Sequence, residues 1–163
     1  MNATAADPGS LPLPELRARR AELQHADDAV SYVRRLAQAR LDLALAERRH
    51  RSQGGDDISN ELPAILGSHL TGGPPRPPRP AEDASDHPLA IELEELCSGL
   101  GATHLDSLGD DELTTLITAL AEFEHARSVE RKELFGRIDA LSAELVRRYR
   151  DGEADVDGLL DDE

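Results

Sequence analysis

Residues 15–53 contain neither proline nor glycine, and this uninterrupted stretch constrains the fold more than any other feature of the sequence. Pro14 suits the first turn of a helix, because proline lacks the N–H that such a position leaves unbonded and its φ angle is already helical. Two glycines follow Gln53, and glycine is common just beyond a helix C-terminus. We therefore predict a helix over about residues 14–53, which would be about 60 Å long.

The apolar residues of this stretch recur at steps of three and four or their multiples, which is the spacing of a coiled-coil seam. They are Leu16, Leu23, Ala26, Val30, Val33, Ala37 and Ala44. A second long helix is predicted over about residues 110–151, with Asp110 as its cap. Its seam consists of Leu113, Leu116, Leu120, Phe123, Leu134, Ile138, Leu141 and Leu145. A shorter helix is predicted over about residues 88–99, with Asp86 near its cap.

Two long helices joined by a flexible loop fold most simply into an antiparallel hairpin. Only 2% of the residues are aromatic, so the core must be built from aliphatic side chains. This composition suits helix packing better than a β-sandwich. The predicted fold class is therefore all-α, an antiparallel coiled-coil hairpin with one short helix packed across it.

The remaining segments are rich in residues that do not support helices. We predict a flexible N-terminus at residues 1–13, a helical hairpin domain at 14–151 and an acidic, disordered tail at 152–163. The hairpin domain contains a linker at 54–86, where TGGPPRPPRP carries five prolines and two glycines. Such a segment favours neither a helix nor a central strand.

The net charge of −15 restricts the partners of the chain. A protein this acidic repels nucleic-acid phosphates, so direct nucleic-acid binding is not expected, and a basic protein surface is the favoured partner. Cys97 is the single cysteine, which excludes a disulfide framework and fits a small buried packing residue. The sequence shows neither a membrane-spanning apolar run nor a signal-peptide pattern, so a cytoplasmic location is expected.

A polar stripe occupies a helical spacing that normally marks an apolar seam. Its members follow one another at steps of 4, 3, 4 and 4, and they are Asp27, Ser31, Arg34, Gln38 and Asp42. At about 100° per residue they fall within an arc of roughly 80°, beside the apolar seam. Taken alone, such a stripe is typical of a solvated helix face with local ion pairs.

A shift of 97 residues places this stripe on a second one in the other long helix. The pairs are Asp27 with Glu124, Ser31 with Ser128, Arg34 with Arg131, Gln38 with Phe135, and Asp42 with Asp139. Four of the five pairs keep their chemistry. In an antiparallel hairpin this repeat has approximate two-fold symmetry, so it predicts a ligand that is itself two-fold symmetric. The agreement between the two copies favours a ligand site over a solvated face.

The residue types of the stripe narrow the ligand further. An arginine can donate two hydrogen bonds to O6 and N7 of guanine, and it can also stack on a purine or pair with a phosphate. A carboxylate can accept hydrogen bonds from N1–H and N2–H of guanine, while serine and glutamine can reach phosphate or ribose. Cyclic di-GMP, a symmetric guanine dinucleotide, meets all of these requirements.

The stripe resembles E-x3-S-x2-R-x3-Q-x3-D, the ligand signature of the RsiG family of actinobacterial anti-sigma factors. The phrases SYVRRLAQARLDLALAE and ELFGRIDALSAELVRR are similar to that family across both long helices. The resemblance implies a helical hairpin that binds cyclic di-GMP as a dimer through the ten stripe residues and, when loaded, sequesters a WhiG-type sporulation sigma factor. Asp27 stands where the family pattern has glutamate, so the acidic side chain is one methylene shorter. Phe135 stands where the pattern has glutamine, so an aromatic ring replaces the amide.

Two other interpretations remain open from the sequence. An acidic coiled-coil scaffold without a small ligand would use the stripes only to set the helix register. Glu47-x-x-His50 and Glu122-x-x-His125 match half of a di-iron bundle site, but the remaining ligands would need a dimer. No nucleophile, phosphate-loop or zinc-protease motif occurs in the sequence. The predicted function is therefore a non-enzymatic signalling protein without a bound metal.

Overall fold

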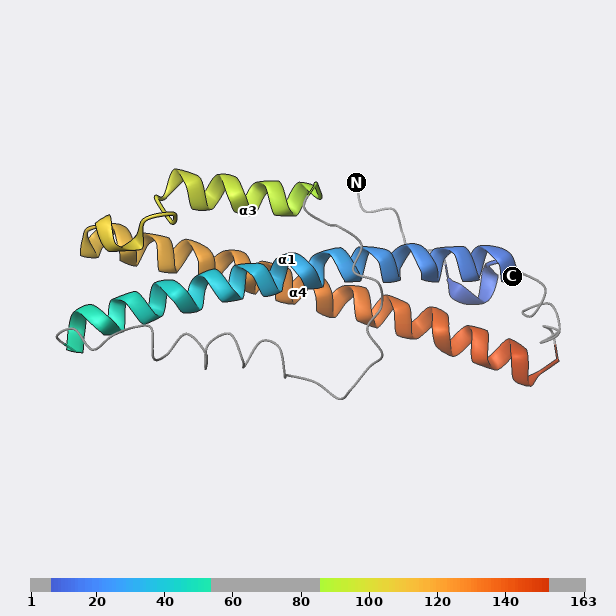
Figure 1. The fold of residues 1–163 in the computed structure, drawn as a ribbon. Coiled ribbons are helices and arrows are strands. Elements are labelled where there is room, and N and C mark those ends of the chain that lie inside the picture. Colours follow the sequence, from blue (N-terminus) through green and yellow to red (C-terminus); the bar gives the residue numbers. More distant parts are fainter. Residues whose placement is uncertain (1–6, 54–85, 153–163) are drawn as a thin grey trace, which may run out of the picture. The chain divides into compact units, whose positions relative to one another are not determined.

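The computed structural model describes residues 7–53 and 86–152. These residues form three α-helices and two 3₁₀ turns, with no strand among them (Figure 1). The elements are η1 at Pro8–Ser10, α1 at Leu13–Gln53, α3 at Pro88–Gly99, η3 at Leu105–Ser107 and α4 at Asp110–Arg150. The predicted all-α class is confirmed, and every predicted helix lies within one residue of its expected bounds. Most of the predicted linker and tail lies outside the described residues.

The helices divide between two compact units, and each long helix contributes to both. The first unit draws on Met1–Asp28 and Glu130–Glu163, and the second unit is Ala29–Val129. Within each unit α1 and α4 run antiparallel, because partners on α4 fall in number as residues on α1 rise. The contacts are Arg17 with Tyr149 and Asp27 with Arg131 in the first unit, and Arg34 with Glu124 and Arg51 with Asp110 in the second.

The cap of α4 lies one residue before its predicted position, whereas the cap of α3 lies next to Asp86, as expected. At α3 the ring of His87, not Asp86, accepts a hydrogen bond at 3.2 Å from the backbone N–H two residues later. Asp86 directly precedes this cap, which agrees with its expected place near the start of the helix. At α4 Asp110 is already helical, and the N–H of Gly109 donates to Glu112 at 2.7 Å. This return contact from the third helical residue is one half of a capping box.

A glycine turn ends α3 and leads the chain toward α4. Gly101 has a φ angle of 72°, in the left-handed region that favours glycine. The N–H of Ala102 donates to the carbonyl of Cys97 at 2.9 Å, and the N–H of Gly101 donates to that of Ser98 at 3.3 Å. This pair of bonds is a Schellman motif, which satisfies the last carbonyls of the helix. A Cβ at Gly101 would lie 2.9 Å from a methyl group of Leu108, so a larger residue is disfavoured twice over.

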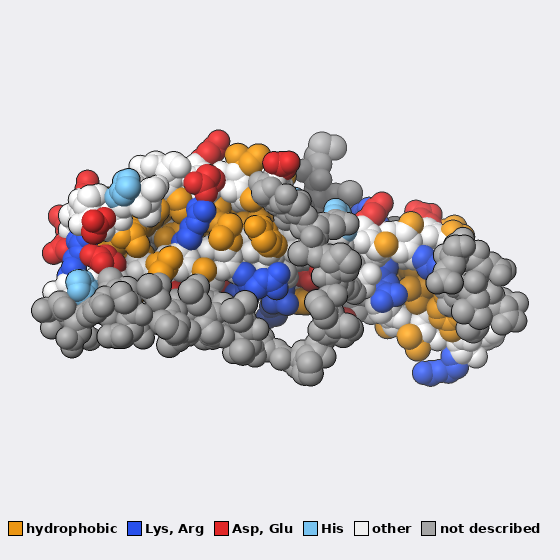
Figure 2. Space-filling view, viewed as in Figure 1, with side chains coloured by type: hydrophobic (Ala, Val, Ile, Leu, Met, Phe, Trp, Pro, Cys, Tyr) orange, Lys and Arg blue, Asp and Glu red, His pale blue; other side chains and the backbone are white. Residues whose placement is uncertain are grey.

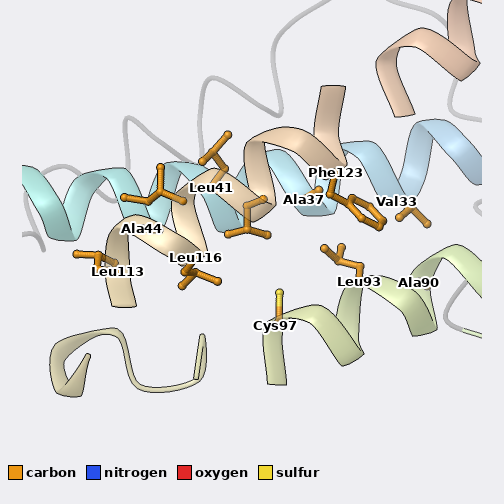
Figure 3. Close-up of a cluster of buried hydrophobic side chains, with 12 residues drawn as sticks. Val33, Ala37, Leu41, Ala44, Ala90, Leu93, Cys97, Leu113, Leu116 and Phe123 are labelled. Atoms are coloured by element: carbon orange, nitrogen blue, oxygen red, sulfur yellow. The ribbon is translucent and has the colours of Figure 1, made fainter. Parts of the chain in front are cut away.

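The core of the second unit is built from all three helices (Figure 3). It contains Val33, Ala37, Leu41, Ala44, Ala90, Leu93, Cys97, Leu113, Leu116, Ile117, Leu120 and Phe123. The aliphatic side chains Leu93, Leu116 and Leu120 are fully buried. Cys97 is buried among them, as the sequence predicted. Because burial of apolar area is the main stabilising term, this cluster holds α3 against the two long helices.

Ion pairs flank the apolar face of α3 on both sides. Arg40 of α1 contacts Glu94 at 2.6 Å, and Arg127 of α4 contacts Glu92 at 3.7 Å. In Figure 2, acidic side chains gather beside apolar ones over the region of α3. Both glutamates are more than half exposed, and pairs of that kind contribute only about 0–1 kcal/mol. The ion pairs therefore orient α3, while the apolar cluster supplies most of the attachment.

In the first unit, a buried arginine ties the N-terminal segment to the end of α4. Arg148 donates hydrogen bonds to the carbonyls of Pro8, Gly9 and Leu11, and also to Glu144. In the same unit, the predicted seam is buried at Leu16, Leu23, Leu134, Ile138, Leu141 and Leu145, whereas the predicted seam residue Ala26 is only half-buried. The seams of both long helices are thereby confirmed at every other predicted position.

The stability of the first unit should depend on pH through Glu144. Hydrogen bonds from Arg147 and Arg148 lower the pKa of this carboxyl from 4.5 to about 2. A carboxyl whose pKa is depressed by folding stabilises the fold above its unfolded pKa, and the contribution is lost as the pH falls from 4.5 toward 2. We expect Glu144→Gln to lower the Tm at neutral pH and to match the wild type at about pH 2. Thermal melts followed by circular dichroism measure this difference.

Glu133→Gln is the matched control, because Glu133 is exposed on the same helix and has no ion pair within the described residues. Its Tm should follow the wild type at every pH. A Tm difference for Glu144→Gln that stayed constant from neutral to acid pH would contradict the assignment.

Candidate functional site

In the second unit, a short ion pair joins the two polar stripes. Nη1 of Arg34 on α1 donates to Oε1 of Glu124 on α4 at 2.9 Å. The exposed fractions of the two side chains are 25% and 18%, so water screens this pair less than a surface pair. The same Oε1 accepts a hydrogen bond from Ser128, also at 2.9 Å. Three stripe residues from two helices are thus connected through one carboxylate oxygen.

Two polar groups beside this ion pair are buried without a partner among the residues that the structure describes. Ser31 is only 8% exposed, and its Oγ makes no hydrogen bond there. The Nε of Arg34 is also buried and makes no hydrogen bond to a described residue. A buried polar atom left unsatisfied costs about 1–3 kcal/mol, so such atoms call for a partner other than the described residues.

Farther along α1, the stripe continues with an internal hydrogen bond. Nε2 of Gln38 donates to Oδ1 of Asp42 at 3.2 Å, and both side chains are half-buried. The second-unit cluster therefore comprises Ser31, Arg34, Gln38, Asp42, Glu124 and Ser128.

In the first unit, the corresponding arginine is held differently. Nε of Arg131 lies 3.6 Å from Oδ1 of Asp27, which is an ion-pair distance but too long for a hydrogen bond. The guanidinium carbon of Arg131 instead lies over the ring of Phe135, 4.7 Å from its centroid. Asp27 is one methylene shorter than glutamate, which accounts for the longer gap. The first-unit cluster comprises Asp27, Arg131, Phe135 and the exposed Asp139.

The two ion pairs are copies of each other under the 97-residue shift. Arg34 corresponds to Arg131, and Glu124 corresponds to Asp27. In each unit the arginine of one copy therefore contacts the acid of the other copy. The repeat found in the sequence is thus also a repeat of contacts between α1 and α4.

One further arginine belongs with the first-unit cluster and was missed from the sequence. Arg20 lies one heptad before Asp27 on α1, so it shares the stripe face. Its Nε is buried and has no hydrogen-bond partner within residues 7–53 and 86–152. The 97-residue shift places Arg20 over Ile117, so the search for matched polar pairs could not reveal it. The heptad spacing alone would have found it.

The other motifs of the sequence form no site in the described part of the chain. Glu47 of the Glu47-x-x-His50 motif contacts Arg51 at 2.7 Å. Within the described residues, no group of three or more histidine, cysteine or acidic side chains could hold a metal ion. None of the described helices is both long enough and apolar enough to cross a membrane.

Comparison with known proteins matches this chain to one family. A family model described as RsiG-like matches residues 2–66 and 101–162, well over half of the chain. The matched ranges contain all ten stripe residues and Arg20, and they leave out residues 67–100, where α3 lies. No curated protein sequence matches the chain.

Proposed function

The chain belongs to the RsiG-like family, and on this premise we propose that it is an anti-sigma factor that binds cyclic di-GMP and, when loaded, sequesters a WhiG-type sigma factor. Membership of this family indicates a regulator that acts on a sigma factor rather than an enzyme. The nucleotide, the type of sigma factor, a role in sporulation and a cytoplasmic location are parts of the proposal.

The reciprocal arginine–carboxylate pairs carry this proposal. Each unit contains an arginine on one long helix and an acid on the other, at 2.9 Å in one case and 3.6 Å in the other. These are the two residue types that guanine needs, because arginine can donate to O6 and N7 while a carboxylate can accept from N1–H and N2–H. The repeat supplies this combination once in each unit, so each unit by itself offers the groups that a guanine needs.

Ligand binding would exchange these internal contacts for contacts to the nucleotide. A phosphate or guanine edge can replace the carboxylate at Arg34, and the guanine N–H groups can replace the arginine at Glu124. Each charged group would keep hydrogen-bond partners in such an exchange, which reduces the penalty for removing a buried charge from its ion pair. The unsatisfied Oγ of Ser31 would gain a hydrogen bond at the same time.

Arg20 extends the proposed contacts of the first unit. Its guanidinium is a second positive charge on the stripe face of the first unit, one heptad before Asp27. Arginine pairs with phosphate through two parallel hydrogen bonds, so Arg20 suits a phosphate of the dinucleotide better than a base edge.

The proposed mechanism is thermodynamic linkage. Within each unit the ligand would contact α1 and α4 together, and a ligand that binds only the folded pair stabilises that pair. The loaded form would then be the one that the sigma factor selects. The acidity of the chain suits this partner, because a sigma factor presents a basic surface to DNA.

Cyclic di-GMP should therefore raise the Tm of the purified protein. A ligand at 100 times its Kd adds about 2.7 kcal/mol to the free energy of unfolding, which corresponds to a Tm increase of roughly 5–10 °C for a domain of this size. Differential scanning fluorimetry with cyclic di-GMP measures the shift, and GMP at equal concentration is the control. In the same preparation, a WhiG-type sigma factor should co-elute with the protein only when cyclic di-GMP is present.

The competing function is an acidic scaffold without a ligand. It is favoured by the fact that Arg34 and Glu124 already satisfy each other, as residues that only set the helix register would. A scaffold predicts an unchanged Tm and sigma-factor co-elution that is independent of the nucleotide. Either result would contradict the proposed ligand.

A further inference from the structure

We propose that Phe135 is a nucleobase-stacking residue that also positions Arg131, so that the first-unit cluster recognises its ligand mainly by stacking. This inference rests on the proposed function and deepens it. The second-unit cluster, with Gln38 at the matching position, recognises its ligand by hydrogen bonds.

Arg34 and Arg131 make different contacts, as expected if one cluster recognises its ligand by hydrogen bonds and the other by stacking. Arg34 donates a hydrogen bond to Glu124 at 2.9 Å. Arg131 stays 3.6 Å from Asp27, and its Nε makes no hydrogen bond to any described residue. Its guanidinium lies over the ring of Phe135 at 4.7 Å, within the range of a cation–π contact. The ring therefore holds the guanidinium in place, while 37% of the Arg131 side chain stays exposed to a ligand.

The ring of Phe135 is also accessible. Its exposed fraction is 37%, which is high for a phenylalanine, and it lies one helical turn from both Arg131 and Asp139. An exposed aromatic ring between an arginine and a carboxylate is a suitable platform for a flat base. Glutamine at this position could donate a hydrogen bond but could not stack in this way.

The two clusters would therefore recognise a base by different interactions. Stacking accepts any purine, because every base presents a π face. Hydrogen bonds to the Watson–Crick edge accept only one base. Selectivity for guanine would then depend mainly on the second-unit cluster, while Phe135 adds affinity in the first unit.

Tryptophan substitution tests the stacking directly. The chain contains no tryptophan, so Phe135→Trp introduces a single indole whose emission reports its own surroundings. Cyclic di-GMP should quench that emission if a base stacks on the indole. Tyr32→Trp is the matched control, because Tyr32 has the same exposed fraction of 37% and lies outside the stripe. Its emission should stay unchanged.

Calorimetry on full-length variants supplies the energetic test. Phe135→Leu keeps an apolar side chain but cannot stack, and it should weaken cyclic di-GMP binding by about 5-fold to 150-fold. Phe135→Tyr keeps the ring and should retain the affinity. Circular dichroism melts check that each variant is folded, which the exposure of Phe135 favours.

The outcomes separate this inference from the proposed function. Normal calorimetric binding by the wild type with unchanged affinity in Phe135→Leu, or with no quenching in Phe135→Trp, would overturn the stacking role alone. Equal quenching in Tyr32→Trp would overturn it as well. An absence of calorimetric binding by the wild type would overturn the proposed ligand, and the stacking role with it.

Discussion

The double variant Arg34→Ala/Arg131→Ala is expected to bind cyclic di-GMP at least about 100-fold more weakly than the wild type. Hydrogen bonds to charged groups contribute about 1.5–3 kcal/mol each, and every 1.4 kcal/mol changes the affinity about tenfold. Each arginine is therefore worth roughly one to two orders of magnitude. Isothermal titration calorimetry of the purified proteins measures the loss, and the single variants show how it divides between the two units.

The control for this experiment is Arg35→Ala/Arg137→Ala. Both residues are exposed on the same helices, so the control removes the same charge while leaving the stripes intact. Its affinity should match the wild type. Truncating Arg34 also leaves the half-buried Glu124 without its partner, so Arg34→Lys/Arg131→Lys is needed as well. Lysine keeps the positive charge but cannot form the two parallel hydrogen bonds of an arginine. An unchanged affinity in Arg34→Ala/Arg131→Ala would contradict the roles assigned to the two arginines.

Leu116→Ala is expected to have the largest effect on stability, a loss of about 2–5 kcal/mol in the free energy of unfolding. Leu116 is fully buried in the cluster where α1, α3 and α4 meet. Alanine removes apolar contacts there and leaves a cavity that the surrounding helices only partly close. Because domains of this size are stable by only about 5–15 kcal/mol, the variant would lose a large share of its total stability. Urea unfolding followed by circular dichroism measures the change.

Ile91→Ala provides the comparison for Leu116→Ala. Ile91 lies on α3 and is 49% exposed, so its truncation should change the stability by less than about 1 kcal/mol. An equal loss in both variants would mean that Leu116 is not the packing centre that its burial indicates.

The helices could be predicted because their signals are local. The stretch without proline or glycine before Gln53 and the heptad spacing of the leucines are readable from neighbouring residues. The helix bounds agree with the structure within one residue, and the seam residues are buried with the exception of Ala26. The cap of α4 was less accurate, because Asp110 is already helical and the capping contact joins Gly109 to Glu112.

The two polar stripes were predictable as faces of the long helices, but most of the contacts of their residues were not. The repeat identified the ten stripe residues because matched polar spacing is a property of the sequence. The sequence could not show which acid each arginine contacts, since Arg34 and Glu124 are 90 residues apart and their meeting depends on helix register. The contact of Arg131 with Phe135 follows from their spacing of four residues on one helix, whereas the unsatisfied Nε of Arg20 emerged only from three-dimensional packing. Periodicity specifies which face a residue occupies, whereas its partner depends on how two distant helices are aligned.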